Sequence, residues 1–250
     1  MSESSELPIV VITGAGSGIG RALAVGLAPA ARLVLAGRRV PELEQTAELC
    51  SGGARVVPTD ITAEDQVERL FDTIATEYGR LDVLVNNAGM FGPVASVAEV
   101  SAEEFQQTWQ TNVVGTVLCS GAAFRQMHSQ HPGGGRIIMI GSISAQVPRP
   151  RSVAYTVTKH ALTGLTRSIN LDGRALGISA TQVDVGNAAT AMTQGMAHGA
   201  EQPDGSRRPE PTFDPDHLAE VLRPVVALPP EVSVPWLTVH ATGMPYAGRG

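Results

Sequence analysis

Tyr155 and Lys159 are the two residues of this chain whose types and spacing point most directly to chemistry. The chain has 17 arginines and one lysine, and that lysine lies four positions after one of only three tyrosines. Arginine replaces most surface lysines at little cost, but not where a compact ammonium is needed. On a helix the two side chains would share a face. A nearby cation favours phenolate, and bringing a phenol pKa from about 10 to near 7 takes roughly 4 kcal/mol.

A tyrosine tuned in this way can exchange a proton with a substrate oxygen. A tyrosine and a lysine at this spacing are, however, more often a core residue and a solvated helix residue. The catalytic interpretation of Tyr155 and Lys159 therefore depends on whether the rest of the chain builds a cofactor site.

A glycine-rich turn near the N-terminus predicts such a site. The apolar run 9–12 leads into the turn 13–20, and a helical pattern follows over 21–28. A short continuous apolar run is typical of a strand buried on both faces. Glycines between a strand and a helix let the backbone approach a phosphate and aim helix N–H groups at it. In this turn the residues expected to contact a dinucleotide are Gly14, Ser17, Gly18, Ile19 and Gly20.

The end of the next predicted strand, 32–36, carries arginines where an acidic residue would indicate NAD. An Asp or Glu about 20 residues after the glycine turn binds the ribose 2′-hydroxyl of NAD, whereas arginine accommodates the 2′-phosphate of NADP. Arg38 and Arg39 stand at this point, and guanidinium groups suit phosphate through forked hydrogen bonds. We therefore expect NADP, with NAD as the alternative. Both arginines could instead be solvated, with Glu42 or Glu44 as partners.

Strand and helix patterns alternate along the rest of this half, which predicts right-handed crossovers and a parallel sheet. Residues 62–65 have the chemistry of a helix start, and Gly79 is expected to end that helix. Asparagines after the fourth strand are expected to tie neighbouring strands together. The predicted elements are helix 41–49, strand 55–58, helix 62–78 and strand 81–85. Further cofactor contacts are expected in two places. Asp60 and Ile61 would lie near an adenine, and Asn87, Ala88 and Gly89 would contact the cofactor after the fourth strand.

The second half supplies candidate residues for a reaction centre. A capping box at Ser101 and Glu104 opens a long helix through about residue 128. Asn112 lies in mid-helix, where a polar residue either faces a partner or is mildly unfavourable. Ser142 follows a strand at its C-terminal end, where doubly wound sheets bind ligands. The other predicted elements are strand 136–140, helix 153–172, strand 178–183, a candidate substrate lid over 191–212, helix 214–227 and strand 234–240.

These motifs, in this order, resemble the short-chain dehydrogenase/reductase family in its single-domain branch. The resemblance covers nearly the whole chain: the turn 13–20, the Asn-Asn-Ala-Gly run 86–89, Asn112, Ser142, and Tyr155 with Lys159. It implies a Rossmann fold, which is a doubly wound parallel sheet of about seven strands with helices on both faces. Residues 1–250 would form one dinucleotide-binding domain with an integral substrate site.

The resemblance also implies roles for individual residues. Tyr155 would be the general acid/base, and Lys159 would lower its pKa and bind the nicotinamide ribose. Ser142 would hold the substrate oxygen, with Ser144 as a second hydroxyl in a less suitable register, and Asn112 would support a water-linked proton relay from Lys159.

The chain departs from the family pattern in two places. Val185 precedes Gly186 where the family usually has Pro-Gly, although Gly186 and Thr190 still align with cofactor contacts. Residues 29–31, Pro-Ala-Ala, replace a customary glycine turn. The tail 241–250 resembles most the NADP-dependent hydroxy-acid dehydrogenases of the family.

Composition narrows the possible partners and locations. A formal charge of −6 without a basic stripe argues against nucleic acid. The polar N-terminus is not a signal peptide, and no apolar run approaches the ~20 residues that span a bilayer. Cys50 and Cys119 have the character of core or helix residues, and His128 and His131 of a surface turn, so we expect no metal. A cytoplasmic protein is the simplest interpretation.

The sequence thus predicts an NADP-linked oxidoreductase that acts on a small ketone or alcohol. Arginines near the substrate mouth could hold a carboxylate: Arg149, Arg151, Arg207 and Arg208. Two alternatives are a binding protein that senses NADP without turnover and a sugar-nucleotide epimerase. The sensor is disfavoured because both Tyr155 and Lys159 are present, and the epimerase because no second substrate domain follows residue 190. The resemblance implies a homotetramer, or a homodimer, that pairs helices 102–128 and 153–172.

Overall fold

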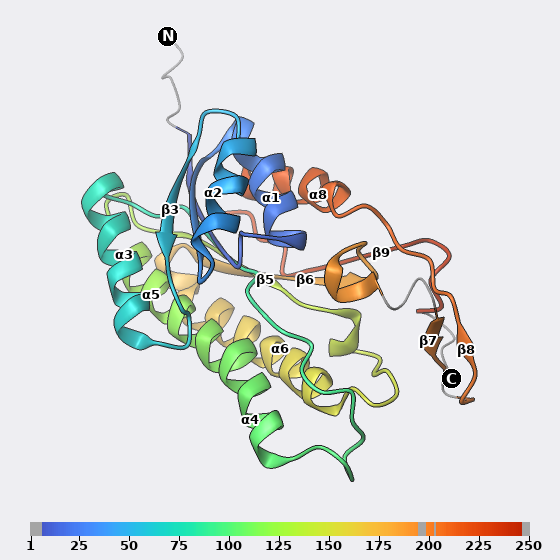
Figure 1. Ribbon diagram of the computed structural model, residues 1–250. Coiled ribbons are helices and arrows are strands. Elements are labelled where there is room, and N and C mark those ends of the chain that lie inside the picture. The colour runs from blue at the N-terminus through green and yellow to red at the C-terminus, as the bar shows by residue number, and fades with distance from the viewer. Residues whose placement is uncertain (1–6, 195–198, 203, 247–250) are drawn as a thin grey trace.

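Seven parallel strands form one sheet in the computed structural model, which describes residues 7–194, 199–202 and 204–246. The strand order is β3-β2-β1-β4-β5-β6-β9, and helices cover both faces (Figure 1). This confirms the predicted doubly wound fold. The strands are β1 (Ile9–Thr13), β2 (Arg32–Gly37), β3 (Ala54–Pro58), β4 (Val83–Asn86), β5 (Gly135–Ile140), β6 (Ile178–Gly186) and β9 (Trp236–His240).

The first strand, β1, lies inside the sheet between β2 and β4. It pairs with β2 on one side and with β4 on the other, both in parallel. The chain therefore winds outward in one direction through β2 and β3, and in the other direction from β4 onward. A crevice opens at such a switch point, beyond the carboxyl ends of the strands, and the candidate site lies there.

Two apolar clusters lie on opposite faces of the sheet, because successive side chains of a strand point to opposite sides. Val10 and Ile12 pack with α1, α2 and α8, whereas Ile9 and Val11 pack with α3, α5 and α6. Figure 1 shows the same separation, with α1, α2 and α8 above the sheet and the other helices below it. The helices are α1 (Gly18–Leu27), α2 (Val40–Leu49), α3 (Glu64–Tyr78), α4 (Ala102–Trp109), α5 (Gly115–Ser129), α6 (Val153–Gly173) and α8 (Asp216–Val226).

The predicted helix ends agree with the structure in two cases and differ in a third. Ser101 and Glu104 form the capping box at α4, and Gly79 ends α3 in the left-handed conformation. The predicted cap at Thr62 is wrong. The Thr62 backbone N–H and hydroxyl both donate to the Asp60 carboxylate, and α3 begins two residues later after Ala63, which provides no side-chain cap.

The long helix predicted through residue 128 is interrupted. A π-helical turn, η2 (Gln110–Val114), separates α4 from α5 and contains Asn112. Such a turn adds a residue to the helix and occurs frequently at functional sites. A sequence pattern of period 3.6 cannot reveal it, because the apolar positions on both sides remain helical.

The segment before α8 carries short regular elements. Among its described residues, η5 (Ala191–Thr193) is a 3₁₀ turn, and β7 (Ala200–Glu201) and β8 (Arg207–Arg208) pair in antiparallel as a small hairpin. The predicted lid spans this segment and includes residues 195–198 and 203, which lie outside the described residues. Its role as a lid stays a prediction. Within the described ranges, no helix is both long and apolar enough to cross a bilayer.

Candidate active site

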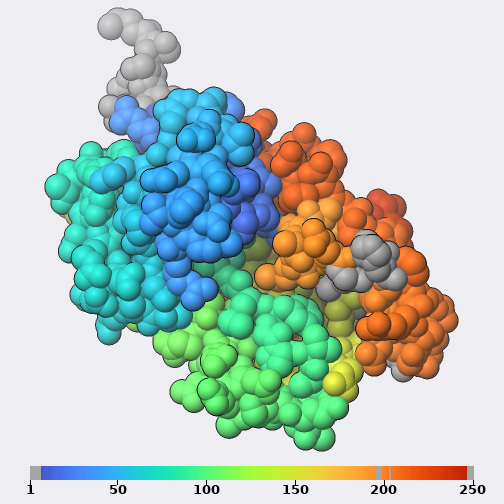
Figure 2. Space-filling view, viewed as in Figure 1, coloured from blue at the N-terminus to red at the C-terminus, as the bar shows by residue number. Residues whose placement is uncertain are grey.

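A cleft of about 920 Å³ lies at the carboxyl ends of β1, β2 and β4. Figure 2 shows this hollow between the blue N-terminal residues, the green residues around α4 and the orange residues that follow β6. Most of the predicted cofactor residues line it: Gly14, Ser17, Gly18, Ile19, Arg38, Arg39, Asp60, Ile61, Asn87, Ala88, Gly89, Tyr155, Lys159 and Thr190. Of the two others, Gly20 packs behind the glycine turn and Gly186 lines an adjoining smaller cavity.

The glycine turn depends on residues that carry no side chain. Gly14 and Gly18 have φ of 66° and 53°, which side-chain-bearing residues rarely adopt. A Cβ at Gly14 would lie 2.8 Å from the Cα of Ala88, and a Cβ at Gly20 would meet the Gly14 carbonyl. Glycine at these positions therefore lets the turn pack closely against Ala88 and on itself, while the turn lines the cleft at the N-terminus of α1.

The asparagine run after β4 fixes this turn against the neighbouring strand, as expected. The Asn87 side chain donates to the carbonyls of Thr13 (2.9 Å) and Gly14 (3.2 Å), and its backbone N–H donates to the Thr13 hydroxyl. Asn86 instead donates to the Ser120 hydroxyl at 2.9 Å. The ends of β1 and β4 are thus joined by side-chain hydrogen bonds at the floor of the cleft.

The two arginines after β2 have different surroundings. Arg39 pairs with Glu42 at 3.0 Å and donates to the Ser17 hydroxyl at 3.2 Å. Arg38 is exposed at the rim of the cleft. Burial raises the pKa of Asp60, but hydrogen bonds from Thr62 together with the charge of Arg38 hold that pKa below its usual value. Glu42 is therefore a partner of Arg39, as the alternative interpretation allowed, and Arg38 contributes an exposed positive charge.

Lys159 and Tyr155 meet beneath this cleft. Lys159 is only 7% exposed, and its Nζ donates to the Ile140 carbonyl at 2.8 Å. That Nζ lies 5.5 Å from the centroid of the Tyr155 ring. The Lys159 ammonium thus lies in the interior beside the phenol, as the catalytic interpretation requires.

Burial controls the pKa of both groups. It lowers the pKa of Lys159 to about 8, against an opposing effect of the Asp184 carboxylate. It also raises the pKa of Tyr155, although hydrogen bonding with Ser142 and the charge of Arg149 act in the other direction. The expectation that Lys159 brings the Tyr155 pKa down is not met in this structure, because loss of solvation is the larger effect.

Ser142 is oriented by the turn that follows β5. Its Oγ accepts from the Ser144 backbone N–H at 3.1 Å, at the start of η3 (Ile143–Ala145). Ser142, Ser144 and Tyr155 line the smaller cavity of about 70 Å³. Both serines are therefore near the phenol, and Ser142 is the one whose hydroxyl acts on the Tyr155 pKa.

Asn112 uses its whole side chain to hold neighbouring segments. Its Oδ1 accepts from the Met90 backbone N–H and its Nδ2 donates to the Met90 carbonyl, each at 2.8 Å. Nδ2 also donates to the Thr158 hydroxyl at 3.1 Å. Asn112 is 1% exposed and thus joins the loop after β4 to α6, one residue before Lys159. Its part in a proton relay stays a prediction.

Two residues of the site escaped the sequence analysis. Phe91 stacks on Tyr155 with ring centroids 4.8 Å apart, and no spacing rule relates residues 64 positions apart. Asp184 is a buried carboxylate that accepts from Gln146 at 2.8 Å and Gln182 at 2.7 Å. The sequence does carry a signal for Asp184, because an acidic residue within an apolar strand is rare without a partner.

The proposed carboxylate site of four arginines is not supported by the structure. Three of these guanidinium groups already pair with acidic side chains. The pairs are Arg149 with Glu210, Arg151 with Glu99, and Arg208 with Asp204. In the described part of the chain, no group of three histidine, cysteine or acidic side chains is placed to hold a metal.

Comparison with known proteins gives consistent matches. Residues 8–201 match the family described as short chain dehydrogenase. An uncharacterised oxidoreductase of Staphylococcus aureus (strain N315) is 31% identical over 234 residues, which cover 93% of this chain and 96% of that protein. A 3beta-hydroxysteroid dehydrogenase of Mediterraneibacter gnavus is 32% identical over 74% of this chain and 68% of its own length. The crystal structure of an alcohol dehydrogenase from Thermococcus sibiricus, complexed with 5-hydroxy-NADP, has a TM-score of 0.82 and 26% identity, and covers 96% of this chain and 98% of that one.

Proposed function

The chain belongs to the short-chain dehydrogenase/reductase family, and on this premise we propose that it is an NADP(H)-dependent oxidoreductase. It would transfer a hydride between the nicotinamide and the carbon of a ketone or secondary alcohol. The observation that carries the proposal is the convergence of Ser142, Tyr155 and Lys159 at the edge of the glycine-lined cleft.

The residues present fit a dinucleotide. Gly14 and Gly18 line the cleft, where a glycine turn at a helix N-terminus lets the backbone approach a pyrophosphate, and the exposed Arg38 and Arg39 suit the 2′-phosphate. The remaining contacts would come from Asp60, Ile61 and Asn87 to Gly89 on one side, and from Lys159, Gly186 and Thr190 on the other. The bound cofactor would supply or accept the hydride.

The protein side of the reaction follows from the charges of the site. Because burial raises the pKa of Tyr155, the phenol is protonated at neutral pH and can donate its proton to the oxygen of a ketone. Ser142 would hold that oxygen through its hydroxyl. Lys159, beside the ring, would stabilise the phenolate that remains, and Asn112 would hold α6 in the register that places Lys159.

The preference for NADP rests on Arg38 and Arg39, and the similar alcohol dehydrogenase was crystallised with an NADP derivative. We expect Arg38→Gln to weaken NADPH binding by roughly tenfold, as for the loss of one charge-assisted hydrogen bond, and to leave NADH binding nearly unchanged. Arg32→Gln, an exposed arginine at the other end of β2, is the matched control. Side-by-side fluorescence titrations with NADPH and NADH measure both constants. Tighter binding of NADH by the wild type would contradict the NADP assignment.

Turnover distinguishes the enzyme from the sensor. The loss of NADPH absorbance with a panel of ketones and quinones should be seen in the wild type and should fall by several orders of magnitude in Tyr155→Phe. Tight binding of NADPH without turnover of any substrate in the panel would instead support a non-catalytic sensor.

We place the enzyme in the cytoplasm, as a homotetramer with α4, α5 and α6 at its interfaces. Light scattering measures the mass, and a monomer would contradict the assembly.

A further inference from the structure

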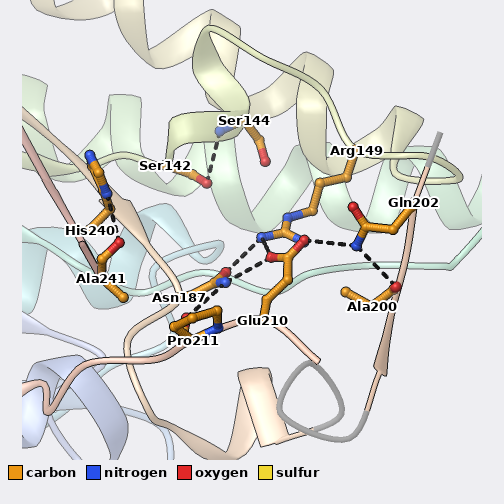
Figure 3. A network of polar contacts seen from close by, with 10 residues as sticks. All are labelled: Ser142, Ser144, Arg149, Asn187, Ala200, Gln202, Glu210, Pro211, His240 and Ala241. Carbon is orange, nitrogen blue, oxygen red and sulfur yellow. Dashed lines mark hydrogen bonds and ion pairs between the residues drawn. The ribbon is translucent and has the colours of Figure 1, made fainter. Parts of the chain in front are cut away.

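A buried ion pair, one member of which is Arg149, lies against the cavity beside Tyr155. Arg149 lines this cavity together with Ser142 and Tyr155. Its Nη2 lies 2.8 Å from Oε2 of Glu210, and the two side chains are only 9% and 2% exposed. Glu210 comes from the segment that follows β8, 61 positions further along the chain, so the pair ties that segment to the loop before α6 (Figure 3).

The carboxylate of this pair is held from several sides. Oε2 of Glu210 accepts from Arg149 and from the Asn187 side chain, each at 2.8 Å, and Oε1 accepts from Gln202 at 3.1 Å. Asn187 has φ of 48°, a conformation that asparagine tolerates better than most residues. Although burial opposes ionisation, these hydrogen bonds lower the pKa of Glu210 to about 2. Glu210 is therefore charged throughout the neutral range.

Only one nitrogen of the Arg149 guanidinium, Nη2, donates hydrogen bonds to described residues. Nη2 of Arg149 donates to Glu210 and, at 2.6 Å, to Oδ1 of Asn187. Within the described residues, neither Nη1 nor Nε of Arg149 has a hydrogen-bond acceptor. These N–H groups belong to a side chain that lines the cavity, so they can donate to an oxygen placed there.

The charges decide which oxygen this would be. Arg149 and Glu210 cancel at short range, and the rest of the cavity lining is largely apolar, with Phe91, Val185 and Met192. An incoming carboxylate would lose its hydration without facing a net positive charge, and such a loss is costly in an apolar site. An uncharged carbonyl, ester or hydroxyl oxygen avoids that cost and still accepts a hydrogen bond from a charged donor.

We propose that, within the oxidoreductase function proposed above, Arg149 and Glu210 determine substrate specificity. Arg149 donates to a second, uncharged oxygen of the ketone, and Glu210 cancels its charge so that keto acids are rejected. The substrate class is thus a ketone with a second neutral acceptor, such as a diketone, a keto ester or a hydroxy ketone. In the reduction the carbonyl carbon gains a hydride from NADPH and its oxygen gains the Tyr155 proton, while Arg149 and Glu210 remain unchanged.

The experiment compares kcat/KM for two substrate pairs. Pentane-2,3-dione against pentan-2-one tests the second oxygen, and methyl acetoacetate against acetoacetate tests the charge. The wild type should favour the first member of each pair by roughly tenfold or more, the effect of one hydrogen bond to a charged group. Glu210→Gln, which leaves the Arg149 charge uncompensated, should lower the ester-to-acid ratio at least tenfold. Glu201→Gln, an exposed glutamate in β7, should leave it unchanged.

A second variant keeps the test independent of folding problems. Arg149→Leu combined with Glu210→Leu replaces the pair by apolar side chains, a change that buried ion pairs often tolerate. It should lower the dione-to-ketone ratio of kcat/KM roughly tenfold relative to the wild type and still reduce pentan-2-one. The inference would be wrong if Glu210→Gln were active with an unaltered ester-to-acid ratio, or if the double variant kept the wild-type dione preference. Either result would leave the proposed oxidoreductase function standing. No NADPH oxidation by the wild type with any of the four ketones would overturn the proposed function, and the inference with it.

Discussion

Loss of solvation acts on both titratable groups at the centre of the site. A lysine whose pKa falls from 10.5 to about 8 is destabilised as a cation by roughly 3 kcal/mol. Tyr155 is destabilised as an anion by the same cause. The site therefore holds a phenol that is neutral at pH 7 and an ammonium with a pKa of about 8. This balance differs from the simple expectation of a cation that acidifies a phenol.

Asp184 is the acidic residue whose charge acts on both groups, since it raises the pKa of Tyr155 and that of Lys159. Asp184→Asn should therefore lower both. Lys159 carries its proton below a pKa of about 8 and loses it above, so an activity that needs the ammonium declines as the pH rises through 8. In the variant this decline should begin at a lower pH.

The measurement is kcat between pH 6 and pH 10. Asp172→Asn, an exposed carboxylate on the same helix as Lys159, serves as the control and should keep the wild-type profile. An alkaline limb that stays in place in Asp184→Asn, or moves to higher pH, would show that Asp184 does not set the charge of the site.

Residues of the site were predictable where a local spacing or motif marked them. Tyr155 and Lys159 lie four apart on α6, and Ser142 lies two residues after the end of β5, so each was visible in a short window of sequence. Phe91 and Glu210 were not, because their partners lie 64 and 61 positions away and packing alone brings them together. The structure also shows that three candidate arginines already have carboxylate partners, which composition could not tell.

At the scale of elements, the strands were the most predictable part. Fully buried strands such as β1 and β4 read as continuous apolar runs bounded by glycine or polar residues. The π turn at Asn112 and the absence of a cap at Thr62 were not predictable, because both depend on hydrogen bonds to residues outside the helix. Asn112 bonds to Met90 across 22 positions, and Thr62 bonds back to Asp60.

The close contact between α1 and α8 leads us to expect that a larger residue at Gly26 destabilises the fold. A Cβ on Gly26 of α1 would meet the Cβ of Ala219 on α8. Gly26→Ala should lower the free energy of unfolding by roughly 1–3 kcal/mol, because it overfills a packed core. In the background of Ala219→Gly the same substitution should cost much less, since the opposing methyl group is gone.

Urea unfolding of the four proteins in this cycle measures the coupling. Ala219→Gly alone should be destabilising by about 1 kcal/mol, as expected for glycine in a helix. Additive effects of the two substitutions would contradict the close approach of the helices.

For the molecule as a whole, the parallel pairing of the strands follows from general rules. Alternating strands and helices predict parallel neighbours joined by right-handed crossovers, and the reversal at β1 then fixes where the cleft opens. The hairpin of β7 and β8, and the tie between Arg149 and Glu210 beside it, could not be foreseen. No periodic pattern specifies how the segment before α8 packs against Arg149 and Asn187.

We propose that Tyr155 supplies the proton for a hydride transfer from a nicotinamide cofactor. The most direct measurement follows deuterium from C4 of labelled NADPH, tested on each face, to the carbinol carbon of a reduced ketone by mass spectrometry. The wild type should give labelled alcohol. Tyr78→Phe, which alters a tyrosine at the end of α3, should do so equally, and Tyr155→Phe should bind NADPH but give almost none. Undiminished transfer in Tyr155→Phe, or no transfer in the wild type, would contradict the account.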